Sequence, residues 1–193
     1  MDVKSLNVLI VGVGGQGTLL ASRILGSIAE IKGLDCKLSE VHGMAQRGGS
    51  VVTHTKLAEK VTSPVISEGG ADIILAFEQL EALRARHYLK EGGAIIVNTQ
   101  KILPMPVITG AREYPEKIVD TIEADGKRVI ALDALAAAEE VGNVKTVNTV
   151  MLGVMAKTVG LDYGVMECAL EKSVPPKVLE INKKALKKGY DML

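Results

Sequence analysis

Three glycines with nucleotide-binding spacing are the clearest chemical signal in the chain. Gly12, Gly14 and Gly17 follow the apolar run Asn7–Ile10 and fit the pattern G-x-G-x-x-G. In this pattern the first glycine permits a sharp turn and the second lets backbone N–H groups approach an anion. The third lets the next helix pack closely. Together with Gly15 and Gln16, these residues form a candidate phosphate or nucleotide site. A purely structural turn explains the same spacing equally well.

A second unusual loop follows Glu40. An acid near this position binds the ribose hydroxyls in dinucleotide-binding proteins, although Glu40 could instead pair with Arg47 or cap the loop. Glycine-rich loops that carry guanidinium and amide groups can bind anions. The same loop could dock another subunit, with Met44 as an adaptable apolar contact. The candidate residues here are Glu40, His42, Met44, Gln46, Arg47, Gly48 and Gly49.

Other reactive residues form no recognisable catalytic or metal-binding set. The three histidines show no metal-ligand spacing, and His54 and His87 are expected to be structural. Cys36 and Cys168 are far apart, whereas an iron–sulfur cluster needs about four cysteines. No nucleophile motif and no tyrosine–lysine pair for hydride transfer is present. We therefore expect no catalytic residue, no metal ligand and no bound cofactor in this chain.

Composition limits the classes of partner. The 193 residues carry a formal net charge of +0, which argues against a nucleic-acid platform. Aromatic residues are only 3% of the chain, too few for a base-stacking surface. No apolar run approaches the ~20 residues of a membrane span, and Met1–Lys4 does not resemble a signal peptide. A cytoplasmic protein with one domain over residues 1–193 is expected.

Alternating strand and helix patterns predict the architecture. The fold class expected is α/β: a Rossmann-like, doubly wound, mostly parallel sheet with helices on both faces. Loops after parallel strands share one edge, so the glycine turn and the loop 42–49 should lie together. Strands are predicted at 5–11, 35–41, 50–57, 72–77, 94–98 and 128–133. Helices are predicted at 18–32, 78–89, 114–125, 134–141, 146–159, 162–173 and 177–190.

Three segments add expectations of their own. Glu91–Gly93 should end the helix predicted at 78–89, and the prolines of Lys101–Pro115 predict an extended excursion. The helix at 146–160 is apolar on more than one face, which is typical of a buried helix. Part of it could instead be buried against another subunit, so self-association stays open.

The motifs together resemble the gamma-type subunits of 2-oxoacid:ferredoxin oxidoreductases, above all the small subunit of the indolepyruvate enzymes. The turn Gly12–Gly17 and the loop Glu40–Ser50 carry the resemblance. It continues through Leu75–Glu78, Val97–Gln100, Ala131–Ala134, the helix of Asn148 and Val174–Pro176. The likeness therefore covers nearly the whole chain.

The resemblance implies a function that the turn alone does not. In this family a large subunit carries thiamine diphosphate and iron–sulfur clusters. The complex oxidatively decarboxylates an aryl-pyruvate to an acyl-CoA and reduces ferredoxin. The chain would be the small subunit, inactive alone, with the loop 44–49 facing the shared active site. Two alternatives stay open: a stand-alone nucleotide-dependent oxidoreductase, and a module that binds CoA or another phosphate ligand.

Overall fold

A computed structural model describes residues 4–43 and 48–193 of the chain. Its centre is one six-stranded sheet with the strand order β2-β3-β1-β4-β5-β6. The strands are β1 (Leu6–Val13), β2 (Asp35–His42), β3 (Ser50–Ala58), β4 (Ala71–Ala76), β5 (Leu89–Asn98) and β6 (Arg128–Leu132). β1, β4, β5 and β6 are parallel to one another, whereas β3 pairs antiparallel with both β1 and β2. The mostly parallel α/β fold predicted from the sequence is confirmed.

The inserted strand β3 departs from a simple Rossmann order. Only seven residues separate β2 from β3, too few for the helical crossover that a parallel pair requires. The two strands therefore pair as a hairpin, and β3 then pairs with β1. β2 still points the same way as β1, so His42 ends at the carboxyl edge of the sheet, where the glycine turn lies.

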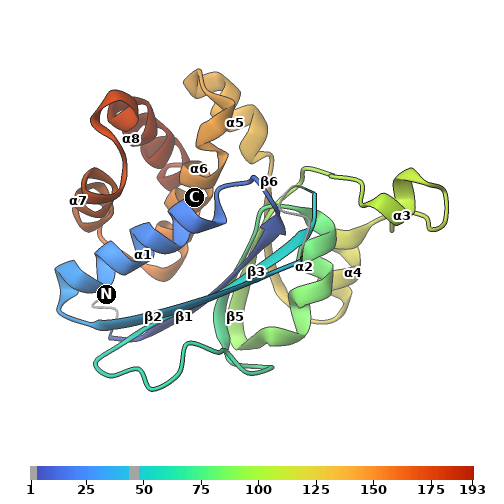
Figure 1. Ribbon diagram of the computed structural model, residues 1–193, viewed down its shortest axis with the longest axis horizontal. Helices are drawn as coiled ribbons and strands as arrows, with labels where there is room; N and C mark the ends of the chain where they lie inside the picture. The colour runs from blue at the N-terminus through green and yellow to red at the C-terminus, as the bar shows by residue number, and fades with distance from the viewer. Residues whose placement is uncertain (1–3, 44–47) are drawn as a thin grey trace.

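Helices cover both faces of the sheet (Figure 1). The larger layer contains α1 (Thr18–Lys32), α5 (Ala134–Val141), α6 (Val147–Val159), α7 (Tyr163–Ser173) and α8 (Pro176–Tyr190). The opposite layer contains α2 (Gln79–Ala85) and α4 (Ile118–Ala124). Alternate side chains of one strand serve the two cores: Val8 and Ile10 pack with the larger layer, Leu9 and Val11 with the smaller one. This alternation is what a sheet covered on both faces requires.

Helix α6 forms the centre of the larger layer. Every side chain from Asn148 to Ala156 is buried within this chain. A Cβ atom at Gly153 or Gly189 would overlap the backbone of the other helix, so α6 and α8 cross at close contact. The prediction that this helix is buried within the chain is therefore confirmed. Its residues 148–156 leave no side chain exposed for contact with another subunit.

Four predicted segments differ from the structure. The helix before Glu91–Gly93 does end ahead of it, but the strand predicted at 94–98 begins earlier, at Leu89, because β5 runs through Glu91–Gly93 with Gly92 at φ +76° and a register shift against β4. The helix predicted at 114–125 is shorter, since α4 begins only at Ile118. The excursion 101–115 contains the short helix α3 (Met105–Ile108), and the helix predicted at 78–89 ends in the 3₁₀ turn η1 (Arg86–Tyr88).

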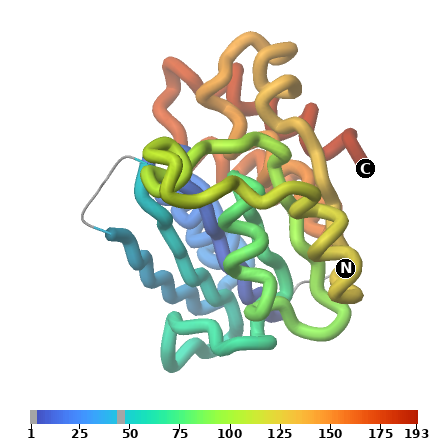
Figure 2. The backbone as a smooth tube through the Cα atoms, turned by 90° about the vertical axis from the view of Figure 1, so that its right-hand side faces the viewer, coloured from blue at the N-terminus to red at the C-terminus, as the bar shows by residue number. Residues whose placement is uncertain are grey.

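The segment between β5 and α4 projects from the body of the molecule. Figure 1 shows α3 at its far end, away from both helix layers, and Figure 2 shows the same yellow-green segment turned toward the viewer. None of the helices in the described ranges is both long and apolar enough to span a bilayer.

Candidate functional site

The glycine turn leaves β1 later than its spacing suggested. Gly12 is still within β1, and the positive φ angles belong to Gly15 (+104°) and Gly17 (+84°). The sharp turn therefore depends on Gly15 and Gly17 rather than on Gly12, because L side chains avoid this region. Gly17 is the N-cap of α1.

Gly12 and Gly17 are also required by close packing. A Cβ atom on Gly12 would lie 2.8 Å from Gln16 Oε1, and one on Gly17 would lie 2.5 Å from Asn148 Nδ2. In the nucleotide-binding pattern the third glycine lets the helix pack closely on the strand. Here Gly17 instead leaves space for the Asn148 side chain of α6. Asn148 Nδ2 donates to the Gly17 carbonyl at 3.3 Å, which joins the turn to α6.

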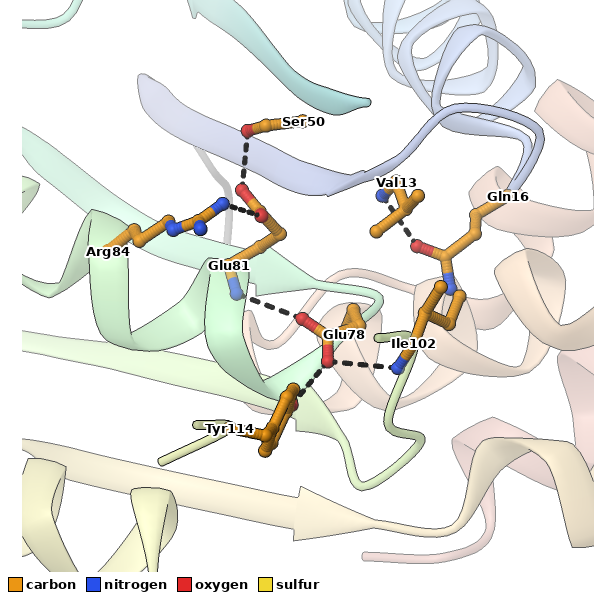
Figure 3. A network of polar contacts seen from close by, with 8 residues as sticks. All are labelled: Val13, Gln16, Ser50, Glu78, Glu81, Arg84, Ile102 and Tyr114. Atoms are coloured by element: carbon orange, nitrogen blue, oxygen red, sulfur yellow. Dashed lines mark hydrogen bonds and ion pairs between the residues drawn. The ribbon is translucent and has the colours of Figure 1, made fainter. Parts of the chain in front are cut away.

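Gln16 is a structural residue of the turn. Its Oε1 accepts from the Val13 N–H at 2.7 Å (Figure 3), and its Nε2 donates to the Phe77 carbonyl at 2.9 Å. Asn98 donates to the same carbonyl at 3.2 Å and accepts from the Ala134 N–H at 3.1 Å. These amides link the carboxyl ends of β1, β4, β5 and β6.

The backbone N–H groups of the turn differ in whether they have a hydrogen-bond partner. The Gly14 N–H donates to the Gly49 carbonyl at 2.9 Å, so the donor expected to meet an anion is already used. Within the described ranges, the N–H groups of Gly15, Gly17, Thr18 and Leu19 have no hydrogen-bond partner. They begin α1, whose N-terminus carries a partial positive charge.

One cavity of about 450 Å³ lies between this turn and β2. The Glu40 carboxylate, in its wall, accepts from the Thr53 hydroxyl at 3.1 Å and the Thr18 hydroxyl at 3.4 Å. A carboxylate so close to the helix N-terminus supplies the negative charge that a phosphate would bring. The lining residues are Gly14, Gly15, Gly17, Thr18, Leu19, Glu40, His42 and Val51.

A second cavity of about 450 Å³ lies on the other side of the turn, toward α5 and α6. Its described lining contains no acidic residue, and the cation Lys145 stands at its edge. Gln100 Oε1 accepts from Gln16 at 3.5 Å and from Asn98 at 3.4 Å, which leaves the Gln100 amide N–H groups as donors. The lining residues are Gly15, Gln16, Gly17, Gln100, Leu135, Val144, Lys145, Val147 and Asn148.

Two buried carboxylates border the same edge (Figure 3). Glu78 and Glu81 are 1% and 4% exposed, three residues apart at the start of α2. Glu81 accepts from the Ser50 hydroxyl at 2.5 Å and pairs with Arg84 at 2.6 Å. Glu78 accepts from the N–H groups of Glu81 at 3.1 Å and Ile102 at 3.2 Å, and from the hydroxyl of Tyr114. Burial, together with the bond to Glu78, raises the pKa of Tyr114 well above 10.

Sequence reasoning missed this pair. Its one signal is Glu-x-x-Glu directly after the buried strand β4, where Glu78 caps α2 by accepting from the Glu81 N–H. Lys145 and Gln100 were missed as well, because their place beside the glycine turn depends on strand order.

Of the residues predicted for a site, the structure brings Gly14, Gly15, Gly17, Glu40 and His42 to one cavity. Gly48, at φ +78°, and Gly49 lie at the base of the loop before β3. Met44, Gln46 and Arg47 lie outside the described residues.

The other histidines have structural surroundings. Buried His54 accepts from the Ile66 N–H at 3.2 Å, and burial lowers its pKa below 6.5. His87 lies 3.8 Å from Glu68 at the surface. In the described ranges, no three His, Cys, Asp or Glu side chains gather as a metal site would require.

Fold and site together define a doubly wound α/β protein whose candidate cavities flank a glycine turn at the carboxyl edge of the sheet. Residues 7–192 match the family described as pyruvate ferredoxin/flavodoxin oxidoreductase, and the chain belongs to this family. The resemblance predicted from the glycine turn and the loop after Glu40 is confirmed.

Relatives match over nearly the full length. The chain is 40% identical to an indolepyruvate oxidoreductase subunit IorB of Archaeoglobus fulgidus, covering 96% of this chain and 94% of that one. Its identity to IorB of Thermococcus kodakarensis is also 40%, over 97% and 95% of the two chains. The crystal structure of a keto/oxoacid ferredoxin oxidoreductase gamma subunit from Geobacter sulfurreducens has a TM-score of 0.71 at 25% identity, covering 96% of both chains.

Proposed function

We propose that this chain is the small subunit of a 2-oxoacid:ferredoxin oxidoreductase of the indolepyruvate type. The complex would oxidatively decarboxylate an aryl-pyruvate, form an acyl-CoA and reduce ferredoxin. The observation that carries the proposal is the match, at 40% identity over 96% of the chain, to a protein named as an indolepyruvate oxidoreductase subunit.

The proposal assigns the cofactors to a large partner subunit. Two cysteines, Cys36 and Cys168, are too few to ligate an iron–sulfur cluster, which takes about four. Thiamine diphosphate, the clusters and the ferredoxin contact would therefore belong to the partner, and CoA would bind in the assembled complex. The chain, one domain over residues 1–193, would work with this partner in the cytoplasm.

The part of this chain that would complete the active site is the carboxyl edge of the sheet. Both cavities, the open N–H groups of α1 and the base of the loop before β3 lie there. In open α/β sheets, ligands bind beyond this edge. The candidate residues of the glycine turn and of the loop Glu40–Gly49 are proposed to face the shared site.

Co-expression with the large subunit tests the proposal. The two chains should co-purify, and indolepyruvate-dependent ferredoxin reduction should need both. Pyruvate and 2-oxoglutarate, assayed in parallel, define the substrate class. A large subunit that is fully active alone would overturn the assignment. So would tight NAD(H) or NADP(H) binding with hydroxy-acid turnover by this chain alone.

A phosphate-bearing ligand is the second candidate, and the cavity beside Lys145 favours it. That cavity combines a cation, the amide donors of Gln100 and the open N–H groups of Gly15 and Gly17, with no acidic residue in its described lining. The cavity beside Glu40 suits hydroxyl groups better, since its carboxylate repels phosphate.

CoA titration of the assembled complex tests this second candidate. Lys145→Ala should raise the KM for CoA about tenfold, as expected for one charge-assisted contact worth ~1.4 kcal/mol. Lys184→Ala is the matched control, because Lys184 is an exposed lysine of α8 that does not line this cavity. An unchanged KM in the Lys145 variant would exclude this cavity as the phosphate site.

A further inference from the structure

A projecting arm, residues 101–113, begins and ends beside the candidate site, and its tip at α3 lies far from it. It leaves the carboxyl end of β5 next to Gln100, passes through α3 and returns to Tyr114. Figure 1 shows this segment standing out from the helix layers, and in Figure 2 it is turned toward the viewer. Because its two ends lie at the sheet edge, the arm extends the face that carries the glycine turn.

Large apolar side chains are exposed along this arm. Leu103 is 48% exposed, Met105 65% and Ile108 61%. Three large apolar side chains are thus exposed within six residues of one segment, and exposed apolar side chains that gather in this way mark contacts with partners. Leu19, Val41 and Val144 are also exposed at the carboxyl edge, so exposed apolar groups concentrate on this side.

Glu78 fixes the base of the arm at both ends. One carboxylate oxygen accepts from the Ile102 N–H at 3.2 Å and from the Tyr114 hydroxyl. The other oxygen accepts from the Glu81 N–H at 3.1 Å, so the carboxylate also holds the start of α2. A buried carboxylate is costly unless it is fully hydrogen-bonded, and here both oxygens are bonded. The base of the arm is thus held in one position before any partner arrives.

The charged residues of the arm indicate what kind of partner surface would be complementary to it. Lys101 and Arg112 flank the three apolar side chains, and within the described ranges neither forms an ion pair; Glu113 is the one acid of the arm and lies at its end, so the arm carries a net positive charge. Lys101 Nζ lies 5.6 Å from the centroid of the Tyr114 ring, which keeps this cation at the base of the arm. A complementary surface would be an apolar groove with carboxylates along its rim.

We propose that the arm 101–113 is the element that docks this chain onto the large subunit, in an apolar groove rimmed by carboxylates. Glu78 is its positioning residue, acting through Ile102 and Tyr114. The inference rests on the proposed function, since it takes the large subunit as the occupant. It adds the surface of this chain that carries the contact and the residue that presets it.

Titration of the large subunit with variants of the full chain tests the docking surface. Leu103→Ser, Met105→Ser and Ile108→Ser combined should weaken association on the order of a hundredfold. Val65→Ser is the matched control, because Val65 is 55% exposed after β3, at the opposite edge of the sheet. It should bind like the wild type. Circular dichroism and thermal unfolding establish that each variant is folded.

Two further variants test charge and positioning. Arg112→Glu should weaken association and reduce its salt dependence. Tyr114→Phe removes one bond to Glu78. It should raise the half-saturating concentration of small subunit threefold to tenfold, while plateau activity stays that of the wild type. Hydrogen exchange at residues 102–113 should become faster in this variant, a change that a general loss of stability would spread over the whole chain.

The outcomes separate the two proposals. If the wild-type chain does not associate with the large subunit, the proposed function fails and this inference fails with it. If the wild type associates and the triple arm variant binds equally well, only the docking surface is refuted. If the arm variant loses self-association but keeps the large subunit, the arm is a contact between copies of this chain, and the proposal is again overturned.

Discussion

Substituting Gly17 by alanine should destabilise the chain through two separable effects. At φ +84°, an L side chain costs about 1–2 kcal/mol. The new Cβ would also lie 2.5 Å from Asn148 Nδ2, and relieving such overpacking costs about 1–3 kcal/mol. The sum, about 2–5 kcal/mol, is a large part of the ~5–15 kcal/mol that stabilises an ordinary domain.

Gly33→Ala is the matched control. Gly33 also has a positive φ, +66°, and a Cβ there would meet nothing within 4 Å. It should therefore show the backbone cost alone, about 1–2 kcal/mol. The difference between the two variants measures the contact with Asn148.

The assay is urea unfolding at 25 °C, followed by circular dichroism, of both variants with and without Asn148→Ala. Removing the Asn148 amide should bring the cost of Gly17→Ala down to that of Gly33→Ala, since only the φ term then remains. Equal costs of the two glycine variants with Asn148 present would refute the argument that α6 presses on the turn.

Three further predictions concern other parts of the fold. Burial and Glu78 raise the pKa of Tyr114 above its ordinary 10, so its stabilising contribution is complete below pH 10 and is lost as pH rises through the folded value. Absorbance titration at alkaline pH should show Tyr114 ionising later than an unfolded tyrosine, and Tyr114→Phe should flatten the alkaline loss of stability; ionisation at pH 10 in the folded chain would contradict this. Gly189→Ala should cost about 2 kcal/mol or more in urea unfolding, because its Cβ would overlap the Val150 backbone of α6; a cost below 0.5 kcal/mol, roughly that of a neutral surface change, would refute the close crossing. Glu40→Gln should lower stability by about 1–2 kcal/mol at pH 7, as for hydrogen bonds to a charged acceptor, since two threonine hydroxyls lose their carboxylate; unchanged urea midpoints would count against that contact.

Helix ends were predicted well where a local signal marks them. α1 and α5 begin and end at the predicted residues, because Gly33 and Gly142 adopt the left-handed conformation that ends a helix. The Asp133 side chain accepts from the Ala136 N–H and so caps α5. These signals lie within one turn of the helix that they end, and a sequence displays them directly.

The start of β5 was predicted wrongly, because the reason for its glycine pair lies in a neighbouring strand and not in the local sequence. Gly92 and Gly93 are typical of a turn, yet here they serve a bulge within a strand. A Cβ on Gly93 would lie 2.8 Å from the Asp72 carbonyl of β4. Only the neighbouring strand reveals this need, and sequence reasoning has no access to it.

The burial of the Glu78 and Glu81 carboxylates could not be predicted either, because it also depends on residues distant in the sequence. Glu78 and Glu81 look like the exposed acids of any helix start, and Glu78 bonds to Ile102 and Tyr114, which follow it by 24 and 36 residues. Their burial depends on the course of the arm after β5, which no local pattern encodes. The charged helix face is the ordinary interpretation of such residues, and here it is wrong.

The glycine turn shows how one spacing can serve two purposes. A dinucleotide-binding turn needs small residues because a pyrophosphate and a helix approach the backbone. In this chain, side-chain amides make the approach: Gln16 lies against Gly12, and Asn148 lies against Gly17. The Gly14 N–H, a donor expected for an anion, bonds to Gly49. Internal contacts therefore account for Gly12 and Gly17 and occupy the Gly14 N–H, so the spacing can specify the fold without requiring a nucleotide. The N–H groups available to a ligand are those of Gly15 and of the start of α1, and the two cavities lie on either side of them.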